Sequence, residues 1–471
     1  MGCRAAVRCN SFVLINMPEH TASETLPHAP LFSTRKIVHM AMLSFAFLLP
    51  YLTWTQAAGC ALLALLFNLV VLPRLGVDLR KSTAAAAPAG GWTGILIYPI
   101  SVLVLILLYR HAMYVVGATW AILALGDGFA GVAGSAWRGP TLPWNREKTW
   151  SGFLAFLLAG GAGAYVLTRW TAPTMAPDFA LGVCATTALV GALVESAPIR
   201  LDDNATVPLV AGAFMFCVCF IERSALDSNL PYLGRRSVLA VAISVALAGL
   251  AWGLKLVTPS GAITGFLLGV AVYLGYGYKS FLLMFTFFLL GSVATRLGYA
   301  RKAARGVAEK RGGARSWREA LANSLAGAFF SILIITTHHE GAFLIALIAA
   351  FAEAAGDTVS SEIGQWISPR AYLITTLRPV PAGQDGGVSV GGSLAGFLAS
   401  ALIVALGYGM GLCGRGGAAL ALLGAVAGNL LDSLLGATLE RRGRVTNGIV
   451  NFAGSSFAGG LALAIALHIG F

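Results

Sequence analysis

The chain has 471 residues, of which 57% are hydrophobic and 11% are charged, and its mean hydropathy is +0.78. This composition excludes a soluble globular domain and indicates an all-α polytopic integral membrane protein. Basic residues outnumber acidic ones by 32 to 20, a net charge of +12. They lie in the connections between apolar segments. Membrane helices orient with basic connections on the cytoplasmic side, and this rule explains the excess of positive charge. We therefore expect no nucleic-acid partner.

About fifteen apolar segments, each long enough for a helix to cross a bilayer, are predicted along the chain. They start near Ile37, Ala57, Gly94, Ala112, Gly152, Ala180, Thr206, Ser237, Gly261, Ser280, Glu319, Gly341, Val388, Gly416 and Ile449. Residues 1–30 read as a disordered N-terminal segment. A polar stretch at residues 222–236, ERSALDSNLPYLGRR, contains Pro and Gly and predicts a linker. We therefore expect two helical-bundle domains, at residues 31–232 and 233–471.

The first half carries an acidic residue inside apolar sequence, in LGDGFAGVAG at residues 125–134. Asp127 would cost at least about 2.5–3.5 kcal/mol at a helix centre, so such a residue is by default a candidate for function. Gly131 and Gly134 leave one helix face bare, which lets a helix or a phosphate approach. The loop that follows supplies cationic groups in Arg138 and Lys148.

Two further clusters of the first half permit more than one interpretation. Residues 35–39, RKIVH, supply Arg35, Lys36 and His39, which either bind substrate or anchor the first helix at lipid headgroups. Asp202, Asp203 and Asn204 are hard oxygen donors suited to Mg²⁺, but an acidic pair in this position is also typical of a helix N-cap.

These motifs, with LPWNREKTWSG and ESAPIRLDDNATVP, resemble the phytol kinase branch of the CTP-dependent polyprenol kinase and phosphatidate cytidylyltransferase superfamily over roughly residues 30–225. The resemblance implies transfer of the γ-phosphoryl group of CTP, or of another nucleotide, to an isoprenoid alcohol. It also implies that Asp127, Asp202 and Asp203 bind Mg²⁺ and that Lys148 and Arg138 contact phosphates. Whether Asp127 is the base or a metal ligand stays open.

The first polar stretch of the second half is a basic run at residues 296–318. This run is either a lipid-facing loop or a cover over nucleotide phosphates. In the second case charge is supplied by Lys302, Lys310, Arg311 and Arg315, while the adjacent glycines let backbone amides turn towards oxygen. Asn323 follows inside the next helix, where its amide needs a partner.

The densest signal lies at residues 352–392, where FAEAAGDTVSSEIG places Asp357 on one helix face with Glu353 and Ser360. Asp385 follows Arg378 in a glycine-rich turn that either binds phosphate or metal or is a plain hairpin. Asn429 and Asp432 share a face of a later apolar helix, and buried polar groups in such helices point inward.

Several stretches of this half closely resemble the integral membrane family that includes the phytyl-phosphate kinases, over roughly residues 240–471. They are LGYARKAARGVAEKRGG, ALANS, GDTVSSEIG, RPVPAGQDGGVS, GNLLDSLLGATLERR and NGIVNF. The resemblance implies a second phosphorylation, from prenyl monophosphate to diphosphate. On matching positions, Asp357, Glu362, Asp385, Asn429 and Asp432 are assigned to metal or phosphate, and Lys310, Arg311, Arg378 and Arg441 to anions.

Joined in one chain, the halves predict a bifunctional, membrane-bound phosphotransferase for isoprenoid salvage of the kind that supplies tocopherol biosynthesis. We expect Mg²⁺ as cofactor and CTP or another nucleoside triphosphate as phosphoryl donor. The expected partners are prenols, prenyl phosphates and membrane lipids. A homo-oligomer is possible from the sequence. The expected location is a bacterial plasma membrane with cytoplasmic active sites. The expected catalytic residues are Asp127, Lys148, Asp357 and Asp385. The alternatives are a CDP-lipid-forming cytidylyltransferase and a transporter of lipids or phosphorylated metabolites.

Overall fold

The computed structural model describes residues 34–74, 93–137 and 139–471, and nearly all of its regular structure is helical. Twelve helices of this described part are long and apolar enough to cross a membrane, and three shorter apolar helices accompany them. Each of the fifteen predicted segments starts inside one of these helices or within two residues of its beginning. The predicted all-α polytopic fold is confirmed, while the disordered segment expected at residues 1–30 lies outside the described residues.

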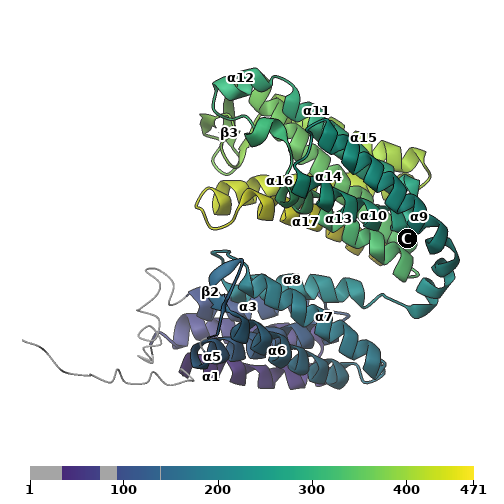
Figure 1. Ribbon diagram of the computed structural model, residues 1–471. Coiled ribbons are helices and arrows are strands. Elements are labelled where there is room, and N and C mark those ends of the chain that lie inside the picture. Colours follow the sequence, from purple (N-terminus) through teal and green to yellow (C-terminus); the bar gives the residue numbers. More distant parts are fainter. Residues whose placement is uncertain (1–33, 75–92, 138) are drawn as a thin grey trace, which may run out of the picture.

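The helices form two bundles that are stacked on each other (Figure 1). The first bundle contains a small antiparallel hairpin in which Thr141 pairs with Thr149. Its elements are α1 (Thr34–Ala41), η1 (Met42–Tyr51), α2 (Trp54–Leu66), η2 (Phe67–Val71), α3 (Thr93–Leu108), α4 (Met113–Ala121), η3 (Ile122–Asp127), α5 (Gly128–Ala136), β1 (Thr141–Leu142), β2 (Asn145–Thr149), α6 (Trp150–Thr171), α7 (Pro177–Ser196) and α8 (Asp203–Val218).

The second bundle is built around one buried helix and carries a three-stranded antiparallel sheet in the order β4-β3-β5. Its elements are α9 (Arg223–Gly253), α10 (Pro259–Tyr276), α11 (Tyr278–Arg296), α12 (Tyr299–Ala304), η4 (Lys310–Gly313), α13 (Trp317–Thr336), α14 (Glu340–Ile367), β3 (Arg370–Leu373), β4 (Pro379–Pro381), β5 (Gly387–Val388), α15 (Val390–Gly409), α16 (Arg415–Leu435), η5 (Gly436–Glu440) and α17 (Asn447–Ile469).

Helix α14 is the central element of the second bundle, because every residue from Ala342 to Gly356 is buried and nearly all of these residues are apolar or small. Glycines bring its neighbours close. A Cβ atom at Gly396 of α15 would lie 2.5 Å from the carbonyl oxygen of Gly356, and one at Gly424 of α16 would lie 3.3 Å from the Cβ of Ala349. Small residues at such positions let helix backbones pack closely within a membrane. Helices α15 and α16 therefore both lie directly on α14.

The passage between the bundles differs from the prediction. Residues 222–236 were expected to form a polar linker, but Arg223 begins α9, which runs unbroken past Pro231 to Gly253. Helix α9 packs against α10 and α13, so it belongs to the second bundle. The chain crosses between bundles in the short connection after Val218, about ten residues earlier than expected.

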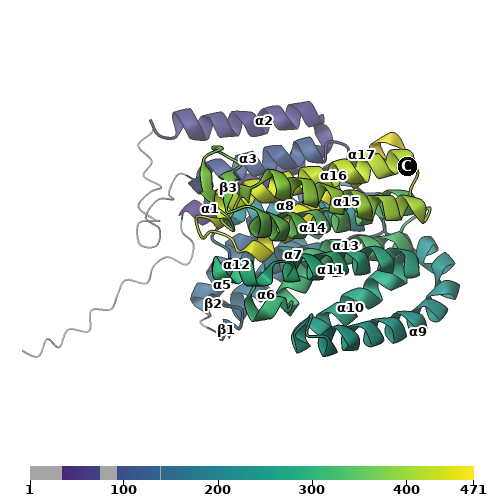
Figure 2. The same cartoon turned by 90° about the horizontal axis from the view of Figure 1, so that it is seen from above.

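Both small sheets lie at the same end of the molecule (Figures 1 and 2). The β1-β2 hairpin caps this end of the first bundle, and β3 to β5 cap it in the second. The opposite end holds the connection between the bundles. Polar loops of both halves are thereby placed on one side of the membrane region.

Candidate functional site

A cavity of about 820 Å³ opens at the sheet end of the second bundle. Helices α13 to α16 and the loops around residues 308–315 and 382–389 form its walls. The structure brings six of the predicted residues of this half together here. They are Asn323, Asp357, Glu362, Asp385, Asn429 and Asp432.

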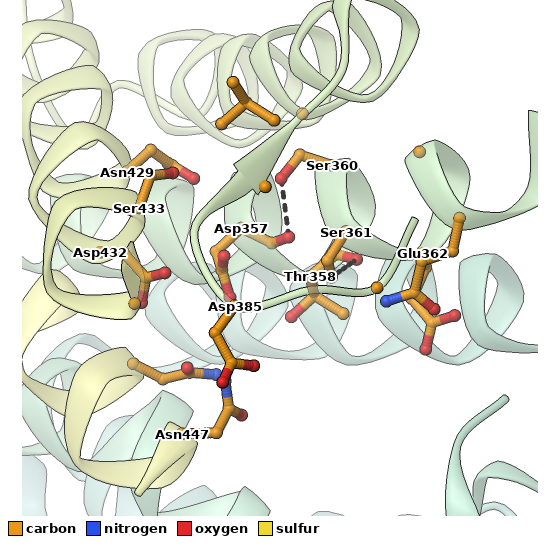
Figure 3. A pocket seen from close by; sticks show the side chains of 18 of the residues that line it. Asp357, Thr358, Ser360, Ser361, Glu362, Asp385, Asn429, Asp432, Ser433 and Asn447 are labelled. Atoms are coloured by element: carbon orange, nitrogen blue, oxygen red, sulfur yellow. Dashed lines mark hydrogen bonds between the residues drawn. The ribbon is translucent and has the colours of Figure 1, made fainter. Parts of the chain in front are cut away.

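Three aspartates that are far apart in sequence meet in this cavity (Figure 3). Asp357 comes from α14, Asp432 from α16 and Asp385 from the loop between β4 and β5. Close carboxylates repel one another unless protons or cations are present. One oxygen of Asp432 and one of the neighbouring Glu353 are buried without a hydrogen-bond partner among the described residues. The site thus has acceptor capacity that the protein itself does not fill.

Amide side chains near the carboxylates form hydrogen bonds with one another and with the helix backbone. Asn451 Nδ2 donates to Asn323 Oδ1 at 3.2 Å, while Asn323 Nδ2 donates to the carbonyl oxygen of Glu319 at 2.9 Å. Asn429 Nδ2 donates to the carbonyl oxygen of Glu353 at 3.3 Å. Asn447, at the start of α17, lies beside Asp385 in Figure 3. The expected partner for the Asn323 amide is therefore found within the cavity wall.

Among the described side chains, Arg315 is the cation that lines this cavity, and it is one of the four cations that the sequence offered for nucleotide phosphates. Its guanidinium carbon lies 5.2 Å from the ring centre of Phe287 and 5.8 Å from that of Phe288. Backbone hydrogen bonds to Leu256 and Thr258 fix the residue in place. Burial lowers the pKa of Arg315, although its guanidinium remains charged at physiological pH. A desolvated cation of this kind is suited to an anionic ligand.

Lys302 and Glu362 are placed differently from our expectation. Lys302 is completely buried, and its ammonium donates to Glu362 at 2.5 Å and to the carbonyl oxygens of Ala294 and Thr295 at 3.1 and 2.9 Å. Its three protons are thus used within the protein, so Lys302 joins α12 to α11 and α14 and does not face a nucleotide. Glu362, expected as a metal ligand, is the counter-ion of this lysine.

The remaining cations expected at this site do not line the cavity. Arg311, Arg378 and Arg441 are exposed. Arg311 lies in η4 with a φ of 57°, next to Gly312 and Gly313, which also have positive φ. The side chain of Lys310 lies outside the described part. Of the expected residues with described side chains, the acidic and amide ones line the cavity, whereas the basic ones other than Arg315 do not.

A smaller cavity of about 240 Å³ opens at the same end of the first bundle, and both Asp127 and Lys148 line it. The Lys148 ammonium donates to the buried Glu195 carboxylate and lies 3.8 Å from Asp203 Oδ2. Burial opposes the charge of Lys148, but the neighbouring Glu195 outweighs this effect and the pKa of the lysine is raised. Lys148 is therefore cationic at neutral pH.

Asp127 lies near two basic side chains, those of His39 and Lys36, in the lining of this smaller cavity. Its Oδ2 is 3.9 Å from His39 Nε2, and the Lys36 side chain lies so close to Gly131 that a Cβ atom there would collide with it. Gly134 lies against α6, where a Cβ would be 3.9 Å from the Cα of Gly152. The bare glycine face predicted for this helix is therefore used for close packing.

The other predicted residues of the first half either cap a helix or lie outside the described residues. Asp202 caps α8, accepting from the backbone N–H of Asn204 at 3.0 Å and from its side chain at 2.7 Å. This is the N-cap alternative stated above, and neither residue lines the cavity. Arg138 and the side chain of Arg35 lie outside the described residues.

Within the described ranges, no group of three His, Cys, Asp or Glu side chains is arranged to hold a metal ion unaided. Mg²⁺ in phosphoryl-transfer enzymes is commonly held by one or two carboxylates together with water and substrate phosphates. Asp357 and Asp432, with an unpartnered buried oxygen on Asp432, fit that manner of binding. The donor set therefore suits a hydrated, phosphate-bound Mg²⁺ and not an all-protein cage.

The loops beside the two cavities touch each other. The backbone N–H of Arg200, which lies between Glu195 and Asp203, donates to the carbonyl oxygen of Arg444 at 2.9 Å. Arg444 lies between Glu440 and Asn447 of the second cavity. The two candidate sites are thus neighbours on one side of the molecule.

Sequence reasoning left out of its site assignments several residues that line the cavities or contact their charged groups. Glu195 and Glu440 are acids near helix ends, a signal that was visible in the sequence. Glu353 shares a helix face with Asp357 and was noted only for that reason. Arg315 was one of four cations offered by the basic run, but the sequence could not single it out, because its position depends on a β-bridge to Val257.

Comparison with known proteins adds independent findings. The model of the family described as "Integral membrane protein DUF92" matches residues 242–463. A membrane protein of Synechocystis sp., sll0875, is 37% identical over 232 residues, which are 48% of this chain and 90% of that protein. Protein VTE6, chloroplastic, of Arabidopsis thaliana is 37% identical over 185 residues, covering 38% of this chain and 56% of that protein.

A third similar protein carries the name of a kinase. The rice (Oryza sativa subsp. japonica) protein named "Probable phytol kinase 1, chloroplastic" is 29% identical over 191 residues, covering 37% of this chain and 61% of that protein. No solved structure matches the chain. The cavity of about 820 Å³ lies within the segment that the family model matches. The chain belongs to the DUF92 family of integral membrane proteins.

Proposed function

We propose that this protein phosphorylates an isoprenoid alcohol such as phytol in two steps. The half at residues 31–232 forms the monophosphate, and the half at residues 233–471 converts it to the diphosphate. Relatives named phytol kinase and VTE6 support a membrane kinase of this kind. The observation that carries the proposal is the larger cavity, where apolar helices bring three aspartates, several asparagines and Arg315 together.

The acceptor chemistry differs between the two proposed steps. A phosphate monoester already carries negative charge and needs neutralisation and alignment, whereas an alcohol must also lose a proton. In the second site, Arg315 would neutralise the acceptor phosphate and the asparagine amides would orient it. In the first site, Asp127 is the proposed proton acceptor and Lys148 the phosphate contact.

Mg²⁺ and CTP, when bound, would supply charge neutralisation and the phosphoryl group. Asp357 and Asp432 would hold the metal in the second site, with Asp385 at the cavity mouth. Asp203 is the corresponding carboxylate in the first, where Asp127 accepts the proton. Positioning and electrostatic stabilisation are the main contributions that a protein makes to this reaction, so no covalent residue is required.

The proposal is tested with membranes that contain the full-length protein, incubated with phytol, Mg²⁺ and either CTP or ATP. Mass spectrometry then separates monophosphate from diphosphate, and EDTA followed by added Mg²⁺ tests the metal. We expect diphosphate from the wild type, monophosphate alone from Asp357→Ala, and no product from Asp127→Ala unless phytyl monophosphate is supplied. A CDP-lipid product, or no phosphorylated prenol from any alcohol tested, would overturn the proposal.

A further inference from the structure

The larger cavity continues from the membrane surface into the bundle. Its lining follows α15 from Ser389 to Ser400, eleven residues, which corresponds to a depth of about 16 Å along a helix. Ser400 is buried, and its hydroxyl donates to the carbonyl oxygen of Ala352 at 2.8 Å. The cavity thus has a polar end at the carboxylates and a deep end among the helices.

The lining away from the carboxylates includes apolar side chains of two neighbouring helices. Phe397 of α15 and Val426 and Leu430 of α16 all line the cavity. The same residues are 47%, 37% and 53% exposed. Side chains that line a cavity and are this exposed indicate that the cavity is open at them. Because both helices are candidate membrane spans, an opening between them would face lipid.

The packing explains why the opening lies between α15 and α16. A Cβ atom at Gly392 of α15 would lie 2.5 Å from the carbonyl oxygen of Ser360. A Cβ atom at Gly428 of α16 would lie 2.7 Å from Glu353 Cγ. Both helices are therefore held on α14, and Figure 2 shows them beside it. Between them the side chains of α15 and α16 border a groove with α14 as its floor.

We propose that Phe397, Val426 and Leu430 form a lateral portal that receives the isoprenoid tail of a prenyl phosphate from the bilayer. The inference rests on the proposed function and adds how its second site takes the substrate. A carboxylate and arginine end joined to an apolar, lipid-facing end matches an amphiphile with an anionic headgroup. The tail remains in an apolar environment throughout, so the hydrophobic cost of extracting it into water does not arise.

Tryptophan substitutions test the portal in the full-length protein in nanodiscs. Val426→Trp and Leu430→Trp should narrow it, whereas Leu398→Trp is the matched control. Leu398 is 59% exposed on α15 beside Phe397 but does not line the cavity. Phytyl monophosphate and the five-carbon dimethylallyl monophosphate serve as long and short acceptors.

For the portal variants we expect kcat/KM with phytyl monophosphate to fall about tenfold while the value with the short acceptor stays within about twofold. Leu398→Trp should change neither value. Equal losses with both acceptors, or the same loss in Leu398→Trp, would overturn the portal. Unchanged kinetics with the long acceptor would do so as well.

A binding measurement separates the portal from the kinase activity. Phytyl monophosphate with a diazirine at the end of its tail should label peptides of α15 and α16, and unlabelled phytyl monophosphate should compete. Labelling at this place without any phosphorylated product supports the portal and contradicts the proposed function. Diphosphate formation with labelling elsewhere contradicts the portal and leaves the proposed function intact.

Discussion

The two candidate sites face the same side of the protein but balance charge differently. In the first, of about 240 Å³, Lys148 is paired with Glu195 and His39 lies near Asp127. In the second, of about 820 Å³, Asp357, Asp385 and Asp432 gather around buried carboxylate oxygens without partners among the described residues. The negative charge of the first site is largely compensated by basic side chains of the protein itself. The second is arranged for cations that come with a ligand.

This difference corresponds to the proposed acceptors. Both proposed steps use a nucleotide with its metal ion, but the neutral alcohol adds no further charge to the first site. A prenyl monophosphate adds its own negative charge to the second site, where more cations are then needed. The comparison can be tested by changing the charge balance of each site separately.

The largest effect is expected for Asp432→Asn. The substitution keeps the shape of the side chain but removes a charge that we assign to metal binding. Conversion of monophosphate to diphosphate should fall by roughly 10²–10³-fold, the range found when one stabilising group is removed from a catalytic site. Formation of monophosphate from phytol should be unchanged.

Asp227→Asn is the matched control for this prediction. Asp227 is exposed on α9 and pairs with Arg223, one helical turn away, so both steps should be unaffected. Parallel losses of both reactions in Asp432→Asn would mean that the aspartate supports the fold of the whole protein. In that case its assignment to the second site would be wrong.

The next largest effect concerns stability and the buried Lys302–Glu362 pair. Lys302→Met would leave the Glu362 carboxylate buried without its counter-ion, a change that typically costs about 3–5 kcal/mol. We expect a lower midpoint in thermal unfolding and no change in KM for the nucleotide in the fraction that remains folded. The double variant Lys302→Met/Glu362→Leu should recover most of the loss. A raised KM for the nucleotide that persists in the double variant would show that Lys302 contributes to nucleotide binding.

A smaller loss is expected for the pair in the first site, because Lys148 is partly exposed. Lys148→Gln leaves buried Glu195 oxygens without their donor, which costs about 1–3 kcal/mol. Lys148→Gln/Glu195→Gln should recover stability but not formation of monophosphate, if Lys148 also contacts phosphate. Recovery of both properties in the double variant would show that the lysine serves only to compensate Glu195.

The sequence located the acidic part of these sites better than the basic part for a physical reason. A carboxylate or amide inside an apolar helix is costly in lipid and must face a cavity or partner, so Asp357, Asn429 and Asp432 could be predicted. A lysine in a connecting loop has no such restriction. Lys302 has its carboxylate partner sixty residues away, a pairing that only the folded chain reveals.

The same limit applies to the boundary between the halves. Polar residues with Pro231 and Gly234 are typical of a linker. The chain is nevertheless helical here, because α9 packs against α10 and α13 and continues through these residues. Tertiary contacts of this kind outweigh local propensity. Apolar segment positions were predicted well because length and hydropathy, which decide them, are local properties.

The smallest expected effect concerns the surface between the sites, where Arg441 and Arg442 are exposed beside the contact of Arg200 with Arg444. If the monophosphate passes from the first site to the second, these cations should hold it near the protein by long-range attraction. In proteoliposomes supplied with phytol, Arg441→Gln/Arg442→Gln should therefore release a few-fold more monophosphate before diphosphate forms, and high salt should remove the difference. Arg223→Gln/Arg235→Gln changes the net charge equally on exposed positions of α9. Equal release from both double variants would mean that overall charge, and not the junction between the sites, retains the intermediate.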